Sequence, residues 1–209
     1  MTSGKELQDD PSTGRRAFFG KAIRRAVGPL AEFIEGKIDQ PAAPAPPPAY
    51  DTSRRIHLRP PGAIPEGAFL ETCYRCGKCT EACPADAIFP LGPEGGVAKG
   101  TPVIDADRSA CVVCEDIRCT QVCESGALAP VLAAADIRMG LAEVYGPICV
   151  RTSGEACTLC VEKCPIGDLA IRFPDTGPPE VIAEGCVGCG VCQMVCPTTP
   201  KAIVVQPFR

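Results

Sequence analysis

The stretch that decides the fold reads CYRCGKCTEACP, residues 73–84, and it spaces four cysteines by two, two and three residues with a proline after the last. The same spacing returns at residues 186–197. Two variants lie between them, one spaced by two, four and three residues (111–123) and one by seven, two and three (149–164). These four quartets use all 16 cysteines of the chain: Cys73, Cys76, Cys79, Cys83, Cys111, Cys114, Cys119, Cys123, Cys149, Cys157, Cys160, Cys164, Cys186, Cys189, Cys192 and Cys196.

This spacing predicts iron–sulfur chemistry. In the bacterial ferredoxin run of this form, three thiolates hold one [4Fe–4S] cluster and the fourth reaches a different one. Four quartets therefore predict four [4Fe–4S] clusters with all 16 cysteines as ligands. Disulfides explain neither the tight spacings nor the proline after three of the quartets. Structural zinc usually takes separated cysteine pairs, often with histidine, whereas His57, the only histidine, lies outside every quartet and is expected to be a surface or packing residue.

The composition favours a fold stabilised by inorganic cores. The 209 residues include 7 Phe, 3 Tyr and no Trp, which is little bulky side-chain volume for an ordinary core. Charge is uneven, because residues 1–59 carry 10 Lys and Arg against 7 Asp and Glu, and residues 60–209 carry 11 against 18. The acidic cysteine-rich region is a poor nucleic-acid binder, and a partner with basic patches would be steered towards it.

The chain before the cysteines divides into three segments. Residues 1–14 are polar and expected to be disordered, residues 15–39 are expected to form an amphipathic helix, and residues 40–55 form a Pro/Ala-rich linker. The four-cluster ferredoxin-like domain is expected to span residues 56–209. No run reaches the roughly 18–20 continuous apolar residues that span a bilayer, so we do not expect an integral membrane protein.

Residues 15–39 allow three interpretations. They begin with Arg15-Arg16, which resembles a twin-arginine export signal, but charged residues interrupt the apolar run that such a signal needs. The apolar stripe also suits a helix that docks on a partner subunit or lies on a membrane surface. We therefore expect a cytoplasmic protein at the membrane periphery, with periplasmic twin-arginine export as the alternative.

We expect an α+β fold of two ferredoxin-like bis-[4Fe–4S] modules, rich in loops. Gly77, Gly188 and Gly190 stand where the backbone must turn closely around a cluster. Residues 131–141 (VLAAADIRMGL) are expected to be a short helix or linker. Short strands are expected at residues 87–89, 102–104, 169–171, 181–182 and 202–205.

Several further segments resemble the NapG/MauM-type ferredoxins, accessory iron–sulfur proteins of periplasmic nitrate reductase and methylamine-utilisation systems. The resemblance rests on residues 58–84 (LRPPGAIPEGAFLETCYRCGKCTEACP), 114–117 (CEDI), 125–128 (SGAL) and 136–141 (DIRMGL), and covers about residues 56–200. It implies four [4Fe–4S] clusters that pass electrons from a membrane quinol-oxidising partner towards a terminal oxidoreductase. The chain departs from the pattern at Glu124, which stands where proline is expected after Cys123.

Similarity to related four-cluster electron-transfer subunits also implies which quartets share clusters. The first quartet would exchange its last cysteine with the fourth, and the second with the third. The implied sets are Cys73, Cys76, Cys79 and Cys196; Cys111, Cys114, Cys119 and Cys164; Cys149, Cys157, Cys160 and Cys123; and Cys186, Cys189, Cys192 and Cys83. The alternative pairs the first quartet with the second and the third with the fourth.

The motifs favour electron transfer over catalysis. Four protein thiolates per cluster leave no open iron site for a substrate, and the chain has no nucleophile–base pair and no flavin or NAD fingerprint. We therefore expect an electron-transfer protein or an electron-transfer subunit of an oxidoreductase complex, and not an enzyme in itself. The alternatives are a maturation factor that donates clusters to a client oxidoreductase and, less favoured, a redox or iron sensor.

Overall fold

Residues 57–208 are described by the structure, a computed structural model. The segments expected at residues 1–14, 15–39 and 40–55, including the amphipathic helix, lie outside the described residues. Within residues 57–208, no helix is both long and apolar enough to cross a membrane.

The first module, residues 57–131, holds the first two cysteine quartets. Its regular elements are short because cysteine loops interrupt them. In chain order they are α2 (Glu66–Thr72), α3 (Lys78–Glu81), β1 (Ile88–Pro90), the 3-10 turn η1 (Pro93–Ala98), β2 (Pro102–Ile104) and α4 (Arg118–Gln121).

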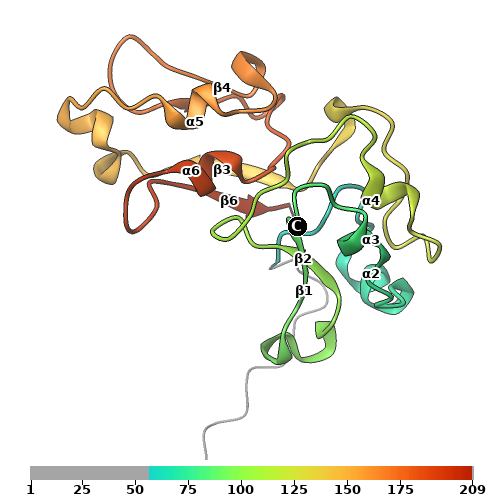
Figure 1. Cartoon of the computed structure of the whole chain (residues 1–209). Coiled ribbons are helices and arrows are strands. Elements are labelled where there is room, and N and C mark those ends of the chain that lie inside the picture. Colours follow the sequence, from blue (N-terminus) through green and yellow to red (C-terminus); the bar gives the residue numbers. More distant parts are fainter. Residues whose placement is uncertain (1–56, 209) are drawn as a thin grey trace, which may run out of the picture. The chain divides into compact units, whose positions relative to one another are not determined.

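The second module, residues 139–208, holds the third and fourth quartets, and a 3-10 turn, η2 (Ala134–Asp136), precedes it. Its elements in chain order are β3 (Gly140–Val144), η3 (Gly146–Ile148), η4 (Val150–Ser153), α5 (Leu159–Glu162), η5 (Gly167–Leu169), β4 (Ile171–Arg172), β5 (Glu180–Val181), α6 (Val191–Val195) and β6 (Ile203–Pro207). Figure 1 shows α2, α3 and α4 together on one side of β1 and β2, apart from the elements of the second module.

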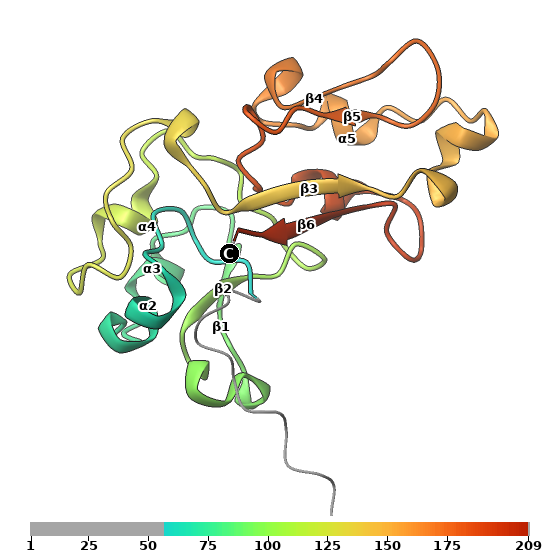
Figure 2. The same ribbon diagram turned by 180° about the vertical axis from the view of Figure 1, so that it is seen from behind.

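Both modules close in the same way. In the second module, β3 pairs antiparallel with β6, so the strand before the third quartet lies beside the strand after the fourth (Figure 2). In the first module, an antiparallel bridge joins Ala63, before the first quartet, to Leu128, after the second. A hairpin lies between the two quartets in each case, β1–β2 in the first module and β4–β5 in the second. Each module is thus one two-quartet unit.

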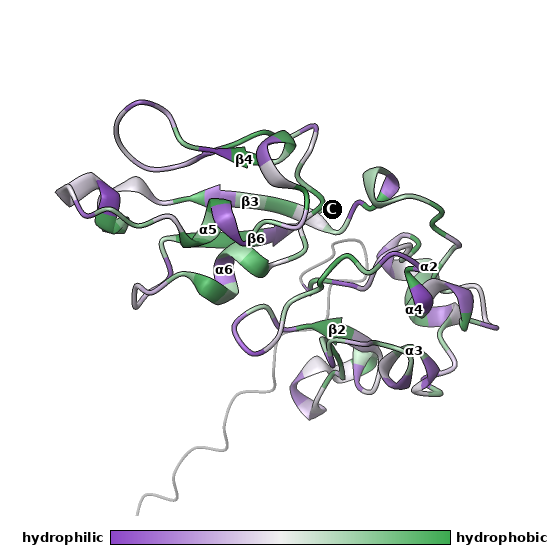
Figure 3. Ribbon diagram, turned by 45° about the horizontal axis from the view of Figure 1, so that its top comes forward, coloured by the Kyte–Doolittle hydropathy of each residue, from purple (hydrophilic) through white to green (hydrophobic). Residues whose placement is uncertain are grey.

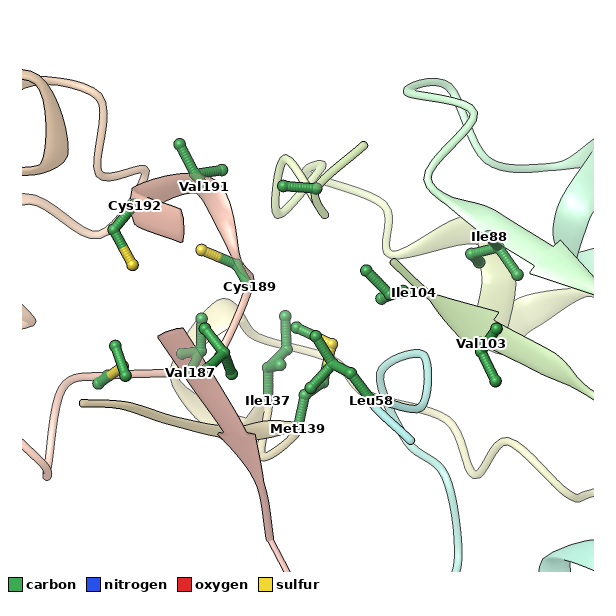
Figure 4. Packing of buried hydrophobic residues seen from close by; sticks show 14 of the residues in the cluster. Leu58, Ile88, Val103, Ile104, Ile137, Met139, Val187, Cys189, Val191 and Cys192 are labelled. Carbon is green, nitrogen blue, oxygen red and sulfur yellow. The ribbon is translucent and has the colours of Figure 1, made fainter. Parts of the chain in front are cut away.

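A continuous apolar core joins the modules. Figure 4 shows Ile137, Met139 and Leu58 between the Val187–Cys189 segment and strand β2. Backbone hydrogen bonds fix this arrangement, from Met139 N to the Val187 carbonyl oxygen at 3.2 Å and from Ile104 N to the Leu58 carbonyl oxygen at 2.8 Å. Strands β2, β3 and β6 are largely hydrophobic along their length (Figure 3).

The small mixed helix-and-sheet fold confirms the expected class, and strands occur near all five places where the sequence predicts them. The prediction for residues 131–141 was incomplete, because a single 3-10 turn, η2, gives way to strand β3 at Gly140. Pairing with β6 makes the last two residues of this segment a strand, since Gly140 lies opposite Pro207 and Leu141 opposite Gln206.

Candidate iron–sulfur sites

Four cavities in the described residues are each lined by four cysteines. Three cysteines come from one quartet and the fourth from its neighbour in the same module. The sets are Cys73, Cys76, Cys79 and Cys123 (site 1); Cys83, Cys111, Cys114 and Cys119 (site 2); Cys149, Cys157, Cys160 and Cys196 (site 3); and Cys164, Cys186, Cys189 and Cys192 (site 4).

This grouping contradicts the pairing that similarity to four-cluster subunits implied. Cys196 lies with the third quartet and not with the first, and Cys83 lies with the second and not with the fourth. Cys123 and Cys164 likewise join the first and fourth quartets, so the exchange is between neighbouring quartets. The reason is topological, because each module pairs the strand before its first quartet with the segment after its second.

Left-handed backbone at fixed places wraps the loops around sites 1, 2 and 4. It occurs two residues after the first cysteine and two residues before the third, where the chain must curl to bring successive thiols to one cavity. These positive-φ residues are Arg75, Val113, Gly188, Gly77, Ile117 and Gly190. The three glycines predicted to turn around a cluster are among them. The third quartet instead uses its longer first spacing, which η3 and η4 fill.

A short helix carries the third cysteine of each quartet. Helix α3, for example, contains Cys79 of site 1, and Cys83 follows one turn later. Cys83 then lines site 2, so the two ends of this turn serve neighbouring sites. Helix α5 does the same in the second module, where Cys160 lines site 3 and Cys164 lines site 4.

A buried alanine followed by a buried Ile or Leu comes after each last cysteine and covers its site. In the first module the alanine is the fourth residue after the cysteine, and in the second module it is the sixth. These side chains line the cavities and form an apolar wall beside the thiols. They are Ala87-Ile88, Ala127-Leu128, Ala170-Ile171 and Ala202-Ile203, each no more than 3% exposed.

Burial changes the proton affinity of the thiols. Desolvation, the largest cause, raises the pKa of Cys79, Cys111 and Cys160 to about 11 and that of Cys119 and Cys189 to about 12. Burial also raises the pKa of Cys192. Neighbouring thiolates add to most of these shifts, for example Cys73 at Cys79. Thiolate charge gathered in such sites needs a positive partner, which iron would provide.

Two of the last cysteines differ from these. At Cys123 and Cys196 burial again favours the neutral thiol, but hydrogen bonds outweigh it and the pKa is lowered. The donors include the hydroxyls of Ser125 and Thr198 and backbone N–H groups such as that of Leu128, 3.3 Å from the Cys123 Sγ. Neither hydroxyl is among the predicted site residues. In the sequence, both share one feature: the hydroxyl residue is the second residue after the last cysteine of its quartet.

The donor sets fit [4Fe–4S] clusters. Each site offers four thiols and an apolar wall, which is the ligand environment of such clusters. No three Cys, His, Asp or Glu side chains in residues 57–208 converge closely enough to bind a single metal ion. Thiols spaced around a cavity in this way suit a group of several atoms better than one zinc ion.

The four sites form one row. Sites 1 and 2 adjoin because Cys79 and Cys83 lie one turn apart, and sites 3 and 4 adjoin because Cys160 and Cys164 lie one turn apart. Between the modules, the Cys111 backbone N–H donates to the Cys189 carbonyl oxygen at 3.0 Å, so sites 2 and 4 adjoin. The order is therefore site 1, site 2, site 4, site 3.

Comparison with known proteins identifies the family of this chain. A family model described as a 4Fe-4S dicluster domain matches residues 72–127, which contain all the cysteines of sites 1 and 2. The chain is 38% identical over 210 residues to the ferredoxin-type protein NapG of Escherichia coli K12, covering 95% of this chain and 87% of that protein. It is 34% identical over 204 residues to the methylamine utilization ferredoxin-type protein MauM of Methylophilus methylotrophus, covering 92% and 86%.

A shorter match links it to the ferredoxin-type protein NapF of Escherichia coli K12, 28% identical over 144 residues, 68% of this chain and 81% of that protein. The extent of the NapG and MauM matches and the dicluster domain together show the family. The chain belongs to the NapG/MauM family of ferredoxin-type proteins, which are iron–sulfur proteins of electron transfer.

Proposed function

We propose that the protein carries four [4Fe–4S] clusters, one in each of sites 1 to 4, and relays electrons between a membrane or quinone-linked donor and a redox enzyme. The observation that carries this proposal is the unbroken row of four sites, each with four cysteines. A bound [4Fe–4S] cluster supplies one-electron chemistry at a potential that its protein surroundings set.

The residues around each site suit transfer better than catalysis. Four thiols per site would occupy every iron and leave no position for a substrate. Apolar side chains such as Ile88 at site 2 and Leu128 at site 1 line the cavities beside the cysteines. Backbone N–H groups, such as that of Ala87 at 3.3 Å from the Cys83 Sγ, hold the thiolates in place.

The two ends of the row are the proposed docking points for electron donor and acceptor. Site 1 reaches the surface at Cys76, which is exposed. Site 3 reaches it beside Leu159, which is 38% exposed and lines that cavity. Residues 60–209 carry an excess of acidic side chains, 18 against 11 basic ones, so the partner surfaces should be basic.

A redox enzyme is the proposed terminal partner. The name of MauM refers to methylamine utilization, and membership of the same family supports a comparable accessory role here. A membrane quinol-oxidising protein is the proposed donor. Residues 15–39 would dock the protein on that partner or on the membrane periphery, on the cytoplasmic side or, after twin-arginine export, in the periplasm.

Deletion of residues 15–39 tests the docking proposal. Loss of co-sedimentation with lipid vesicles would indicate a membrane-surface helix, and loss of binding to the quinol-oxidising protein alone would indicate subunit docking. Unchanged behaviour in both assays contradicts the proposal.

The test of the relay is anaerobic iron and sulfide analysis with a redox titration followed by electron paramagnetic resonance. We expect about 16 iron atoms per chain, four for each site, and signals that appear stepwise and interact as neighbouring sites are reduced. Zinc in place of iron would contradict the proposal. Clusters that stay silent and move to an added apo-enzyme would instead indicate a maturation factor.

A further inference from the structure

The last cysteines of the four sites differ in the side chain two residues further on. Ser125 follows Cys123 of site 1, and its Oγ lies 3.5 Å from the Cys123 Sγ. Thr198 follows Cys196 of site 3, and its Oγ1 lies 3.2 Å from the Cys196 Sγ. Sites 1 and 3 are the two ends of the row, so each end carries a hydroxyl against a cysteine sulfur.

The chemistry of an iron ligand fixes the direction of these hydrogen bonds. A cysteine bound to iron is a thiolate without a proton, so the hydroxyl must be the donor. Each hydroxyl oxygen in turn accepts a backbone N–H, from Ala127 at 3.3 Å to Ser125 and from Ala202 at 2.8 Å to Thr198. These are the buried alanines that follow the last cysteine. In both places their N–H groups orient the hydroxyl, so that a chain of two hydrogen bonds runs from the N–H through the O–H to the sulfur.

The two inner sites lack this chain of hydrogen bonds. The residue two positions after Cys83 of site 2 is Ala85, and the Ala87 backbone N–H donates directly to the Cys83 Sγ at 3.3 Å. In site 4 the corresponding residue after Cys164 is Ile166, and the Ala170 N–H donates to the Gly167 carbonyl oxygen at 3.0 Å. Neither side chain can donate a hydrogen bond to sulfur.

We propose that Ser125 and Thr198 set the reduction potentials of the two end sites, raising them above the values those sites would have without a hydroxyl donor. A hydrogen bond to a ligand sulfur stabilises the extra negative charge of the reduced state, and so raises the potential. This inference rests on the proposed function, because it requires a cluster in each site. It makes the two hydroxyls tuning residues for the points where electrons enter and leave.

The test compares midpoint potentials in Ser125→Ala, Thr198→Val and the double variant of the full chain. Each single variant is expected to lower the midpoint potential of one cluster only. At a fixed potential, the reduced-to-oxidised ratio of that cluster should fall by up to about tenfold. The double variant is expected to lower two midpoint potentials. Ser125→Thr, which keeps the hydroxyl, should restore the wild-type value. Ser153→Ala is the matched control, because the Ser153 hydroxyl donates to the Val150 carbonyl oxygen at 2.8 Å and touches no cysteine.

A second readout follows the hydrogen bond itself. In D2O, pulsed electron paramagnetic resonance should detect exchangeable deuterons coupled to an end cluster, and Ser125→Ala should remove the hydroxyl deuteron while that of the Leu128 amide, 3.3 Å from the Cys123 Sγ, remains. If the variants keep their full iron content, their midpoint potentials and the deuteron signal, Ser125 and Thr198 do not tune the clusters. The proposed electron transfer through the four sites would still stand. If the unmodified protein contained much less iron than four clusters require, that result would instead contradict the proposed function itself.

Discussion

The backbone N–H of Cys111 donates a hydrogen bond of 3.0 Å to the carbonyl oxygen of Cys189. Cys111 lines site 2 and Cys189 lines site 4, so this bond joins the inner sites of the two modules. The next residue, Gly190, packs so closely against the first module that a Cβ there would lie 2.6 Å from the Ala106 Cβ and 3.7 Å from the Ala110 Cβ. The junction between the two inner sites is therefore tightly packed.

Gly190→Ala should loosen this junction. The residue has a φ of +87°, which costs a non-glycine residue about 1–2 kcal/mol, and its Cβ would displace Ala106. Gly77→Ala is the matched control, because Gly77 has a φ of +80° and its Cβ would meet nothing within 4 Å. We expect Gly190→Ala to lose clusters faster than Gly77→Ala on anaerobic heating, followed by absorbance. Equal rates would mean that backbone strain alone matters.

The grouping of the cysteines predicts which double variants lose one cluster and which lose two. Cys76 and Cys123 line the same site, so Cys76→Ala with Cys123→Ala should remove about four iron atoms. Cys196 lines site 3, so Cys76→Ala with Cys196→Ala should remove about eight. If the first quartet instead exchanged its last cysteine with the fourth, and the second with the third, these two results would be reversed. Iron and sulfide analysis of the purified variants separates the two pairings without any partner protein.

Much of this arrangement could be predicted from the cysteine spacings, but the pairing could not. The spacings identify all 16 candidate ligands. They leave the partner quartet open, because every last cysteine follows its helix in the same way. A finer signal was present in the buried alanine, which lies four residues after Cys83 and Cys123 but six after Cys164 and Cys196. That difference groups the quartets as the modules do.

Other features depend on contacts that no local pattern carries. Strand β3 forms because β6, about 60 residues later in the chain, pairs with it. The sequence does not reveal the buried ion pair of Arg59 and Glu66 either. Charged residues are almost never fully buried unless paired, and the sequence pattern does not show that these two meet. Arg59 was grouped with the basic residues of the N-terminal part, yet it is 0% exposed.

Arg59→Met should destabilise the first module strongly. The Arg59 guanidinium binds both carboxylate oxygens of Glu66 and donates to the Thr101 hydroxyl at 2.8 Å. Removing it leaves the Glu66 carboxylate buried without its charged partner, which costs about 3–5 kcal/mol. Arg59→Met with Glu66→Gln removes both charges and should recover part of the loss. Anaerobic denaturant unfolding measures both, and a single variant as stable as the unmodified protein would contradict this role.

Cluster assembly should be favoured by rising pH. Burial raises the pKa of Cys79 and Cys111 to about 11 and that of Cys119 to about 12, so near neutral pH the cluster-free protein holds these thiols protonated. Iron must displace those protons, and a higher pH lowers their competition. Anaerobic reconstitution at a series of pH values between about 6.5 and 8.5 should therefore reach a higher rate at the alkaline end. A rate independent of pH would mean that proton release does not limit assembly.

The same shifts have the opposite consequence for the cluster-free fold. A thiol whose folded pKa is raised stabilises the fold below its unfolded value of 9.0, and this contribution is lost as pH rises towards about 11 or 12. The cluster-free protein should therefore lose stability across that alkaline range. The loaded protein should not, because its thiolates are already deprotonated. Thermal unfolding of both forms at several pH values measures the difference.

Oxidative loss of iron should begin at site 1. Cys76 is the one exposed thiol among the 16 cysteines, whereas Cys186, Cys189 and Cys192 of site 4 are all buried. Brief exposure to an oxidant and a chelator, followed by alkylation and mass spectrometry, reports which thiols iron has released. We expect Cys73, Cys76, Cys79 and Cys123 to become labelled together, before any cysteine of site 4. Early labelling of Cys196 with Cys76 would instead support the pairing across modules, and early labelling of site 4 would mean that burial does not control cluster loss.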